Sequence, residues 1–206
     1  MASQSSSSEV QLPTPVKDGT FSVEAALQAR RSVRSYADQA LALKEVGQLL
    51  WAAQGTTSAR GFRTAPSAGA LYPLELFIVV GNVSGLPAGV YRYHPNTHTL
   101  NQTTGGDLRD ELSQAALRQR SLAEAPMVLV ISAVYERTTA KYRDRGMRYV
   151  LMEAGHAAQN IYLQAVPLDI GTVVIGAFKD QQVQSLLNCQ SNERPLYLMP
   201  LGKLPR

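Results

Sequence analysis

The sequence predicts a single globular domain that mixes helices with strands, of either the α+β or the α/β class. Its 206 residues suffice for one domain with a hydrophobic core, and its fractions of apolar (45%) and charged (17%) residues are typical of globular proteins. Segments with helical periodicity alternate with short apolar runs along the chain. They do not form clean βαβ units, so both classes stay open.

Five segments have the spacing of amphipathic helices, and residues typical of helix ends accompany them. Ser22, Asp107 and Asp180 can accept hydrogen bonds from the first free amides of the helices they precede. Gly55 is suited to end the second helix and Pro167 to stop the fourth. The predicted helices span 23–31, 43–54, 107–120, 144–166 and 181–187.

The helix over 144–166 is the longest and contains small residues between 154 and 158. Small side chains allow the close approach of another helix or of a second chain. Glu153 and His156 in this helix have the spacing of a carboxylate–histidine metal site. Such a site needs further ligands from other helices, which the sequence does not offer. We therefore expect no metal and a buried, hydrogen-bonded His156.

Short runs rich in β-branched residues predict strands. The run over 127–134 is the most hydrophobic in the chain and is interpreted as a central strand. The run over 74–80 is bounded by Pro73 and Gly81 and has the character of a buried strand. The predicted strands span 74–80, 127–134, 172–175 and 196–201, with a hairpin over 89–102.

Residues 1–20, rich in serine, proline and polar residues, predict a flexible N-terminal arm before one domain over 21–206. This terminus has no secretory signal, and no apolar run approaches the ~20 residues of a membrane span. The single cysteine, Cys189, fits a reducing compartment, and we expect a cytoplasmic location.

Two segments contain residue types that suit ligand binding. Arg30, Arg31, Ser32 and Arg34 could grip a phosphate with charge-assisted hydrogen bonds, or form a solvated basic helix end. The small residues 66–69 (Pro66, Ser67, Ala68 and Gly69) let the backbone approach a flat ligand, or form a tight loop before a strand. No Gly-rich phosphate loop of a nucleotide-binding protein is present.

The neighbours Lys141 and Tyr142 also allow two interpretations. In the first, both residues belong to a solvated loop. In the second, the neighbouring Lys141 cation favours the phenolate of Tyr142, which acts as a general acid or base. Lysines and arginines gather around 30–34 and 137–148, but the net charge of +4 is mild. A small anionic ligand explains them as well as nucleic acid does, and aromatic residues hardly interleave with them.

Several short motifs, taken together and in their order along the chain, resemble the nitroreductase superfamily of flavin enzymes, in particular its SagB-type branch of thiazoline/oxazoline dehydrogenase-like proteins. The motifs span about residues 22–203 and are Arg30–Arg34, Ala65–Pro73, Glu153–Asn160, Gly176–Phe178 and Leu196–Gly202. The resemblance implies an α+β fold with a mostly antiparallel central sheet flanked by helices. It also implies an interlocked homodimer that binds FMN at the subunit interface.

The resemblance further assigns roles to residues. Arg30, Ser32 and Arg34, with Arg31 in the same segment, would hold the FMN phosphate and the pyrimidine edge of the ring, while Lys203 would complete the phosphate clamp. Pro66, Ser67, Ala68 and Gly69 of the partner chain would line the isoalloxazine. Gly176 and Ala177 would present backbone amides to it, and Gln159 would be a flavin neighbour. Lys141 and Tyr142 would be the catalytic pair.

The expected function is that of an FMN-dependent oxidoreductase with hydride transfer through flavin N5, in the form of azoline dehydrogenation on a peptide or small molecule. The azoline dehydrogenases of the resembling branch often work in complexes and carry extra N-terminal sequence, whereas about 20 residues precede the core here, and this departure keeps a free-standing small-molecule reductase close behind. The alternatives are an NAD(P)H-dependent nitro or quinone reductase and a non-catalytic flavin-binding protein. No nucleic-acid, membrane or metal partner is expected.

Overall fold

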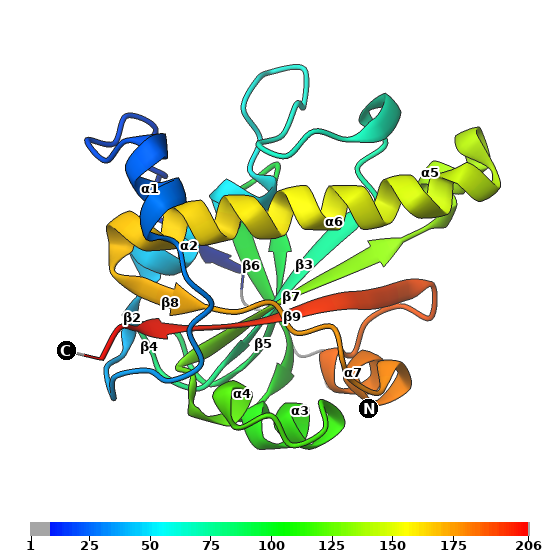
Figure 1. The fold of residues 1–206 in the computed structure, drawn as a ribbon. Helices are drawn as coiled ribbons and strands as arrows, with labels where there is room; N and C mark the ends of the chain where they lie inside the picture. Colours follow the sequence, from blue (N-terminus) through cyan, green and yellow to red (C-terminus); the bar gives the residue numbers. More distant parts are fainter. Residues whose placement is uncertain (1–8, 206) are drawn as a thin grey trace.

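A seven-stranded sheet forms the centre of the computed structural model, which describes residues 9–205 (Figure 1). Its strand order is β1-β6-β5-β3-β7-β9-β8, and every pairing within it is antiparallel. A separate parallel pair joins β2 (Leu41–Ala42) to β4 (Val83–Ser84). The strands of the main sheet are β1 (Glu9–Gln11), β3 (Leu74–Val80), β5 (Gly89–His94), β6 (Thr99–Gly105), β7 (Met127–Val134), β8 (Ile170–Thr172) and β9 (Glu193–Lys203).

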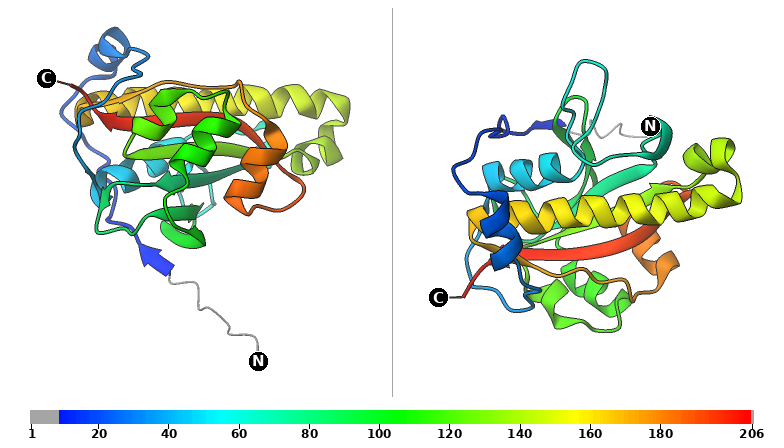
Figure 2. Two further views of the ribbon diagram at one scale, coloured as in Figure 1. Left: turned by 90° about the horizontal axis from the view of Figure 1, so that it is seen from below. Right: turned by 45° about the horizontal axis from the view of Figure 1, so that its top comes forward.

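Helices cover both faces of this sheet (Figures 1 and 2). One core cluster packs Leu76 and Ile78 of β3 with residues of α2 and α6, and a second packs Phe77 and Val79 with residues of α3, α4 and α7. Because side chains alternate along a strand, the central strand has no polar face. The helices are α1 (Val23–Ala29), α2 (Leu43–Gln54), α3 (Arg109–Ala115), α4 (Arg120–Glu124), α5 (Glu136–Tyr142), α6 (Asp144–Ala165) and α7 (Asp180–Leu187), with short 3₁₀ turns η1 (Ala68–Ala70) and η2 (Val166–Leu168).

The α+β class and the mostly antiparallel sheet are confirmed. Helix α2 and strands β3 and β7 have the predicted bounds, and β5 and β6 form the predicted hairpin. Ser22 caps α1, since its Oγ accepts a hydrogen bond of 3.1 Å from the Ala25 amide. These elements combine uninterrupted periodicity with end residues whose side chains satisfy the free backbone groups.

The single helix predicted over 107–120 is wrong, because α3 ends at Ala115 and α4 begins at Arg120. Leu117 and Arg118 adopt φ angles of 58° and 61°, which a right-handed helix cannot include. Asp107 is not the N-cap, which is Leu108, although its carboxylate accepts a hydrogen bond of 3.2 Å from the Arg109 amide.

Three further boundaries differ from the predictions. The strand predicted over 172–175 ends at Thr172, and Ile175 makes only an isolated bridge with Leu198. Asp180 is the first residue of α7, with Lys179 as its N-cap. Strand β9 extends well beyond 196–201, because it pairs with β7 along nearly its whole length.

Part of the segment expected to be a flexible arm lies on the domain. Strand β1 pairs with β6 at the sheet edge, and Leu12 is buried. The Val16 amide donates a hydrogen bond of 2.8 Å to Gln48 of α2. Residues 1–8 of the predicted arm lie outside the described residues. Within residues 9–205, no helix is long and apolar enough to cross a membrane.

Candidate functional site

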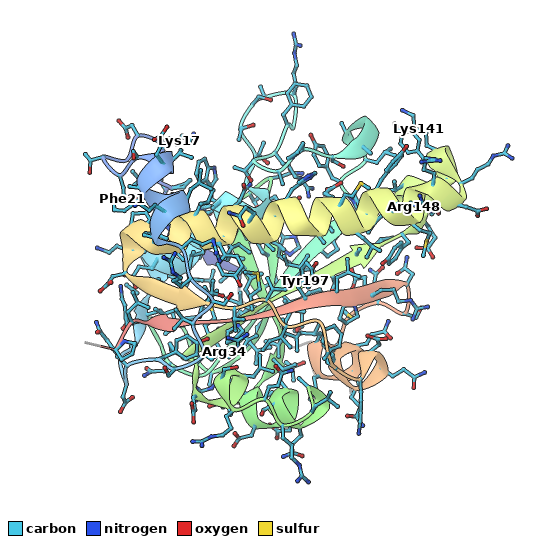
Figure 3. All side chains as sticks on the ribbon, in the orientation of Figure 1. Lys17, Phe21, Arg34, Lys141, Arg148 and Tyr197 are labelled. Carbon is cyan, nitrogen blue, oxygen red and sulfur yellow. The ribbon has the colours of Figure 1, made fainter. Side chains whose placement is uncertain are left out.

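Two of the predicted site segments lie at opposite ends of α6, one after α1 and the other in α5 (Figure 1). Tyr162, near the end of α6, contacts Arg30 and Ser32, which follow α1. Tyr149, near its beginning, packs against Tyr142 of α5. Thirteen residues of helix separate the two tyrosines, which is about 20 Å at 1.5 Å per residue. Arg34 and Lys141 likewise lie far apart in Figure 3.

The loop over 66–69 lies directly against the Lys141–Tyr142 pair. Gly69 has a φ angle of +66°, and a Cβ atom built there would be 2.8 Å from Tyr142 Oη and 3.0 Å from Lys141 Nζ. The Lys141 ammonium is 5.3 Å from the centroid of the Tyr142 ring. The pair belongs to helix α5, which the sequence interpretation as a solvated loop missed. One chain therefore brings together a small-residue loop and a possible acid–base pair.

Hydrogen bonds and stacking hold this loop in an unusual backbone conformation. Ala70 and Tyr72, like Gly69, have positive φ angles, of 54° and 47°. The Ser67 hydroxyl accepts a hydrogen bond of 2.9 Å from the Tyr72 amide. The Arg63 guanidinium stacks 4.6 Å from the centroid of the Tyr72 ring. Such strained residues persist only where their surroundings fix them.

A buried carboxyl group lies close to the loop, and sequence reasoning considered it only as part of a metal site that it then rejected. Glu153 of α6 is 3% exposed, and its Oε1 atom has no hydrogen-bond partner in the described part of the chain. Burial raises the pKa of Glu153 to about 7, although the Ser67 hydroxyl and the Arg63 guanidinium act to lower it. Its position on the apolar face of the helix, between Val150 and Ala154, was a signal that could have identified it.

The arginine segment shows features of both interpretations. Ser32 Oγ lies 3.2 Å from Tyr162 Oη, and the Arg30 guanidinium is 5.4 Å from the centroid of the Tyr162 ring. Arg31 instead donates to the carbonyls of Gln28 and Arg30, so it caps the end of α1. Arg34 is exposed. Arg30, Ser32 and Arg34 therefore offer the polar atoms for an anion, while Arg31 stabilises the helix end.

Lys203 is engaged within its own chain. Its Nζ donates to Glu45 Oε1 at 2.6 Å and to the Leu168 carbonyl at 2.7 Å, and its side chain is 14% exposed. To bind a phosphate, this ammonium would have to leave Glu45.

The loop after β8 presents free backbone groups. Gly176 and Ala177 are exposed, and within residues 9–205 neither amide donates a hydrogen bond, although the Ala177 carbonyl accepts one from Gln119. A Cβ atom at Gly176 would meet only the Tyr197 ring, at 3.9 Å. Two free amides beside open space suit the polar edge of a ligand.

The remaining predictions on α6 concern exposed residues. Gln159 is exposed on the helix surface. His156 is exposed as well, so the prediction of a buried histidine is wrong; Ala157 and Ala158 occupy the buried face instead. No group of three or more His, Cys, Asp or Glu residues within 9–205 could hold a metal ion.

A hollow of about 780 Å³ lies between residues 14–23, α2 and the last turns of α6. Its lining includes Gln48, Trp51 and Leu163 but none of the residues predicted for the site. The chemistry of the loop and of the Lys141–Tyr142 pair, rather than the size of a cavity, therefore locates the candidate site.

An antiparallel sheet with helices on both faces and a small-residue loop against a Lys–Tyr pair define a class of α+β domain. Residues 27–203 match the model of the Nitroreductase family, and the chain belongs to that family of oxidoreductases. Members of the family typically use a flavin.

Three similar proteins give more detail. A Methanocaldococcus jannaschii protein provisionally named a nitroreductase is 48% identical over 195 residues, which cover 95% of this chain and 96% of that protein. A crystal structure from Ralstonia eutropha JMP134, with the same provisional name, has a TM-score of 0.85 and 28% identity and covers 96% of this chain and 90% of that one. The Escherichia coli microcin synthetase complex McbBCD, with truncated pro-microcin B17 bound, matches with a TM-score of 0.74 and 25% identity over 94% of this chain and 77% of the matched chain.

Proposed function

We propose that the protein is a homodimeric FMN-dependent oxidoreductase of the SagB type that dehydrogenates azoline rings in a peptide. The observation that carries this proposal is the contact of Gly69 with Lys141 and Tyr142, because it sets an acid–base pair beside a surface suited to a flat ring. The similarity to a synthetase complex with a bound pro-peptide supports a peptide as the substrate.

The described residues fit a flavin in their chemistry. Gly69 is exposed and has no side chain, which lets Tyr142 and Lys141 lie close to the loop, and the free amides of Gly176 and Ala177 can donate to carbonyl and nitrogen atoms of the ring. Arg30, Ser32 and Arg34 would hold the phosphate and the pyrimidine edge. Their positive charge would also stabilise an anionic ring after reduction.

In the proposed reaction, bound FMN supplies the acceptor for the hydride. The azoline loses a hydride and a proton, so two electrons leave the substrate and an aromatic azole forms. Tyr142 Oη is the proposed proton acceptor, and the Lys141 ammonium lies 5.3 Å from the centroid of its ring. An external electron acceptor completes the cycle.

The site would be shared between two chains. Arg30 and Ser32 lie about 20 Å along α6 from Tyr149, beside the Lys141–Tyr142 pair, so one chain does not bring both groups to one ring. Near its Tyr149 end, α6 exposes Met147, Leu151 and Met152, with 47%, 52% and 58% of their surface accessible. A second copy that covers this apolar surface would also bring the two half-sites together.

The test is the visible spectrum and turnover of the purified protein and of its K141A and Y142F variants. We expect twin flavin absorption bands and FMN release on denaturation in all three proteins. Azoline oxidation should fall by roughly 100-fold or more in both variants, because general acid–base catalysis contributes at least that factor. A colourless protein that does not take up FMN, or variants with full activity, would contradict the proposal.

The second candidate function is NAD(P)H-dependent reduction of nitro or quinone compounds, which the provisional names of the two nitroreductase-like relatives favour. Water or the substrate can supply the proton in that reaction. The K141A and Y142F variants would then keep most of the NAD(P)H-driven activity, and this result separates the two functions.

A further inference from the structure

Arg137 joins the helix that carries the Lys141–Tyr142 pair to the loop that faces it. Its Nη1 donates a hydrogen bond of 2.9 Å to the Tyr72 carbonyl, and its Nη2 donates one of 2.5 Å to Glu75 Oε1. Residues four apart on a helix share a face, so Arg137 and Lys141 both point toward residues 66–72 from consecutive turns of α5. We propose that Arg137 is a positioning residue that fixes this loop against Lys141 and Tyr142.

The loop needs such a fixed point. Gly69, Ala70 and Tyr72 all have positive φ angles, and the last two carry side chains that make this conformation costly. Within the loop, the Ala70 amide donates to the Ser67 carbonyl at 3.1 Å, and the Tyr72 amide donates to the Ser67 hydroxyl at 2.9 Å. Among the described residues, Arg137 makes the only hydrogen bond between α5 and the Tyr72 backbone.

Arg137 is itself anchored in the body of the sheet through alternating charges. Glu75 of β3 accepts from Arg137 and, at 3.2 Å, from Arg92 of β5. Arg92 donates two hydrogen bonds, of 2.6 and 2.7 Å, to Glu193 at the start of β9, a carboxylate that is 1% exposed. The two terminal nitrogens of Arg92 thus bridge two carboxylates, since Nη1 donates to Glu75 and Nη2 to Glu193, and such charge-assisted hydrogen bonds are the strong ones. These ion pairs therefore anchor α5 to three strands of the sheet, β3, β5 and β9, and not to the loop alone.

This inference rests on the proposed function for its catalytic consequence, but the fixing of the loop can be measured without turnover. Hydrogen exchange at the Ala70 and Tyr72 amides should be faster in R137Q by roughly tenfold or more, because a charge-assisted hydrogen bond is lost. Exchange in β7 and α2 should stay as in the wild type. In R137K the effect should be smaller, since lysine keeps the charge but cannot donate as a planar fork.

The matched control is R120Q, which removes an exposed i,i+4 pair with Glu124 on the other face of the sheet and should leave exchange in the loop unchanged. For azoline oxidation by FMN-loaded protein, R137Q should lower kcat by roughly tenfold with a smaller change in KM, and R137K should recover part of this loss. Unchanged exchange at Ala70 and Tyr72, or a faster loop with an unchanged kcat, would overturn the inference. If the wild type oxidises no azoline, the proposed function has failed, and the exchange rates alone still decide whether Arg137 fixes the loop.

Discussion

Gly69 combines a backbone requirement with a close approach of other atoms. Its φ angle of +66° disfavours any side chain, and a Cβ atom would also meet Tyr142 Oη and Lys141 Nζ at 2.8 and 3.0 Å. We predict that G69A displaces the Lys141–Tyr142 pair and lowers the proposed azoline oxidation at least tenfold. Thermal unfolding should show a destabilisation of about 1–2 kcal/mol, the usual cost of this conformation with a side chain.

The matched control for this prediction is G61A. Gly61 has a φ angle of +77° but nothing within 4 Å of a built Cβ atom. The G61A variant should therefore lose about as much stability as G69A but keep most of its activity. Equal losses of activity in the two variants would mean that the contact with Lys141 and Tyr142 is not what matters at Gly69.

Glu153 should make stability depend on pH. Its folded-state pKa of about 7 lies above the ordinary value of 4.5, so the folded protein binds more protons than the unfolded chain between these two values. Stability from this group therefore falls as pH rises from about 4.5 to 7 and stays low above pH 7. We predict that E153Q removes this part of the pH dependence, so that its melting temperature relative to the wild type rises between pH 5 and pH 8.

The control for Glu153 is D144N, which changes an exposed carboxylate on the same helix and should leave the pH dependence of wild type intact. The measurement is the melting temperature of the wild type, E153Q and D144N at several pH values. A parallel pH profile for E153Q and the wild type would show that Glu153 stays ionised in the folded protein.

At this scale, the sequence supports some site residues better than others. The residues 66–69 and the Lys141–Tyr142 dipeptide are recognisable by their types and order along the chain. The surroundings of Lys203 and His156 could not be predicted in this way. The partner of Lys203, Glu45, lies 158 positions away in the sequence, and the exposure of His156 depends on what packs on α6. Arg137 was visible only as one of many cations until the structure placed Tyr72 and Glu75 beside it.

At the scale of elements, predictions succeed where one segment carries its own signal. Helix α2 has a continuous apolar face and strand β7 is buried on all positions, so both were predictable to the residue. Helix α5 is only seven residues long and follows a strand directly, which leaves too few turns for periodicity to show. The break between α3 and α4 depends on two left-handed residues, Leu117 and Arg118, that no glycine announces.

The short strands show the same dependence on distant partners. Strand β1 exists because β6 offers it an edge, and β8 is defined by the pairing of its three residues with residues 201–203 of β9. Their sequences are polar or contain glycine and do not alternate clearly. Pairing with distant segments of the chain decides such strands, and the local sequence cannot report it.

At the scale of the whole molecule, α6 acts as a spacer. The order of strands in the sheet sets β8 and the arginine segment at one end of this helix, and α5 with the loop over 66–72 at the other (Figure 2). Neither strand order nor this separation could be read from the sequence, because both depend on how the chain crosses between distant strands. The resemblance to a family supplied the expectation of a second subunit.

The separation along α6 has a genetic consequence. Two alleles that are each null, one with R30A and one with K141A, should complement when they are expressed together. In the proposed homodimer, random pairing makes about half of the dimers mixed, and each mixed dimer has one intact site, so roughly a quarter of wild-type activity should return. A chain with both substitutions should complement neither allele, and failure of the two single alleles to complement would mean that each chain works with its own arginine segment.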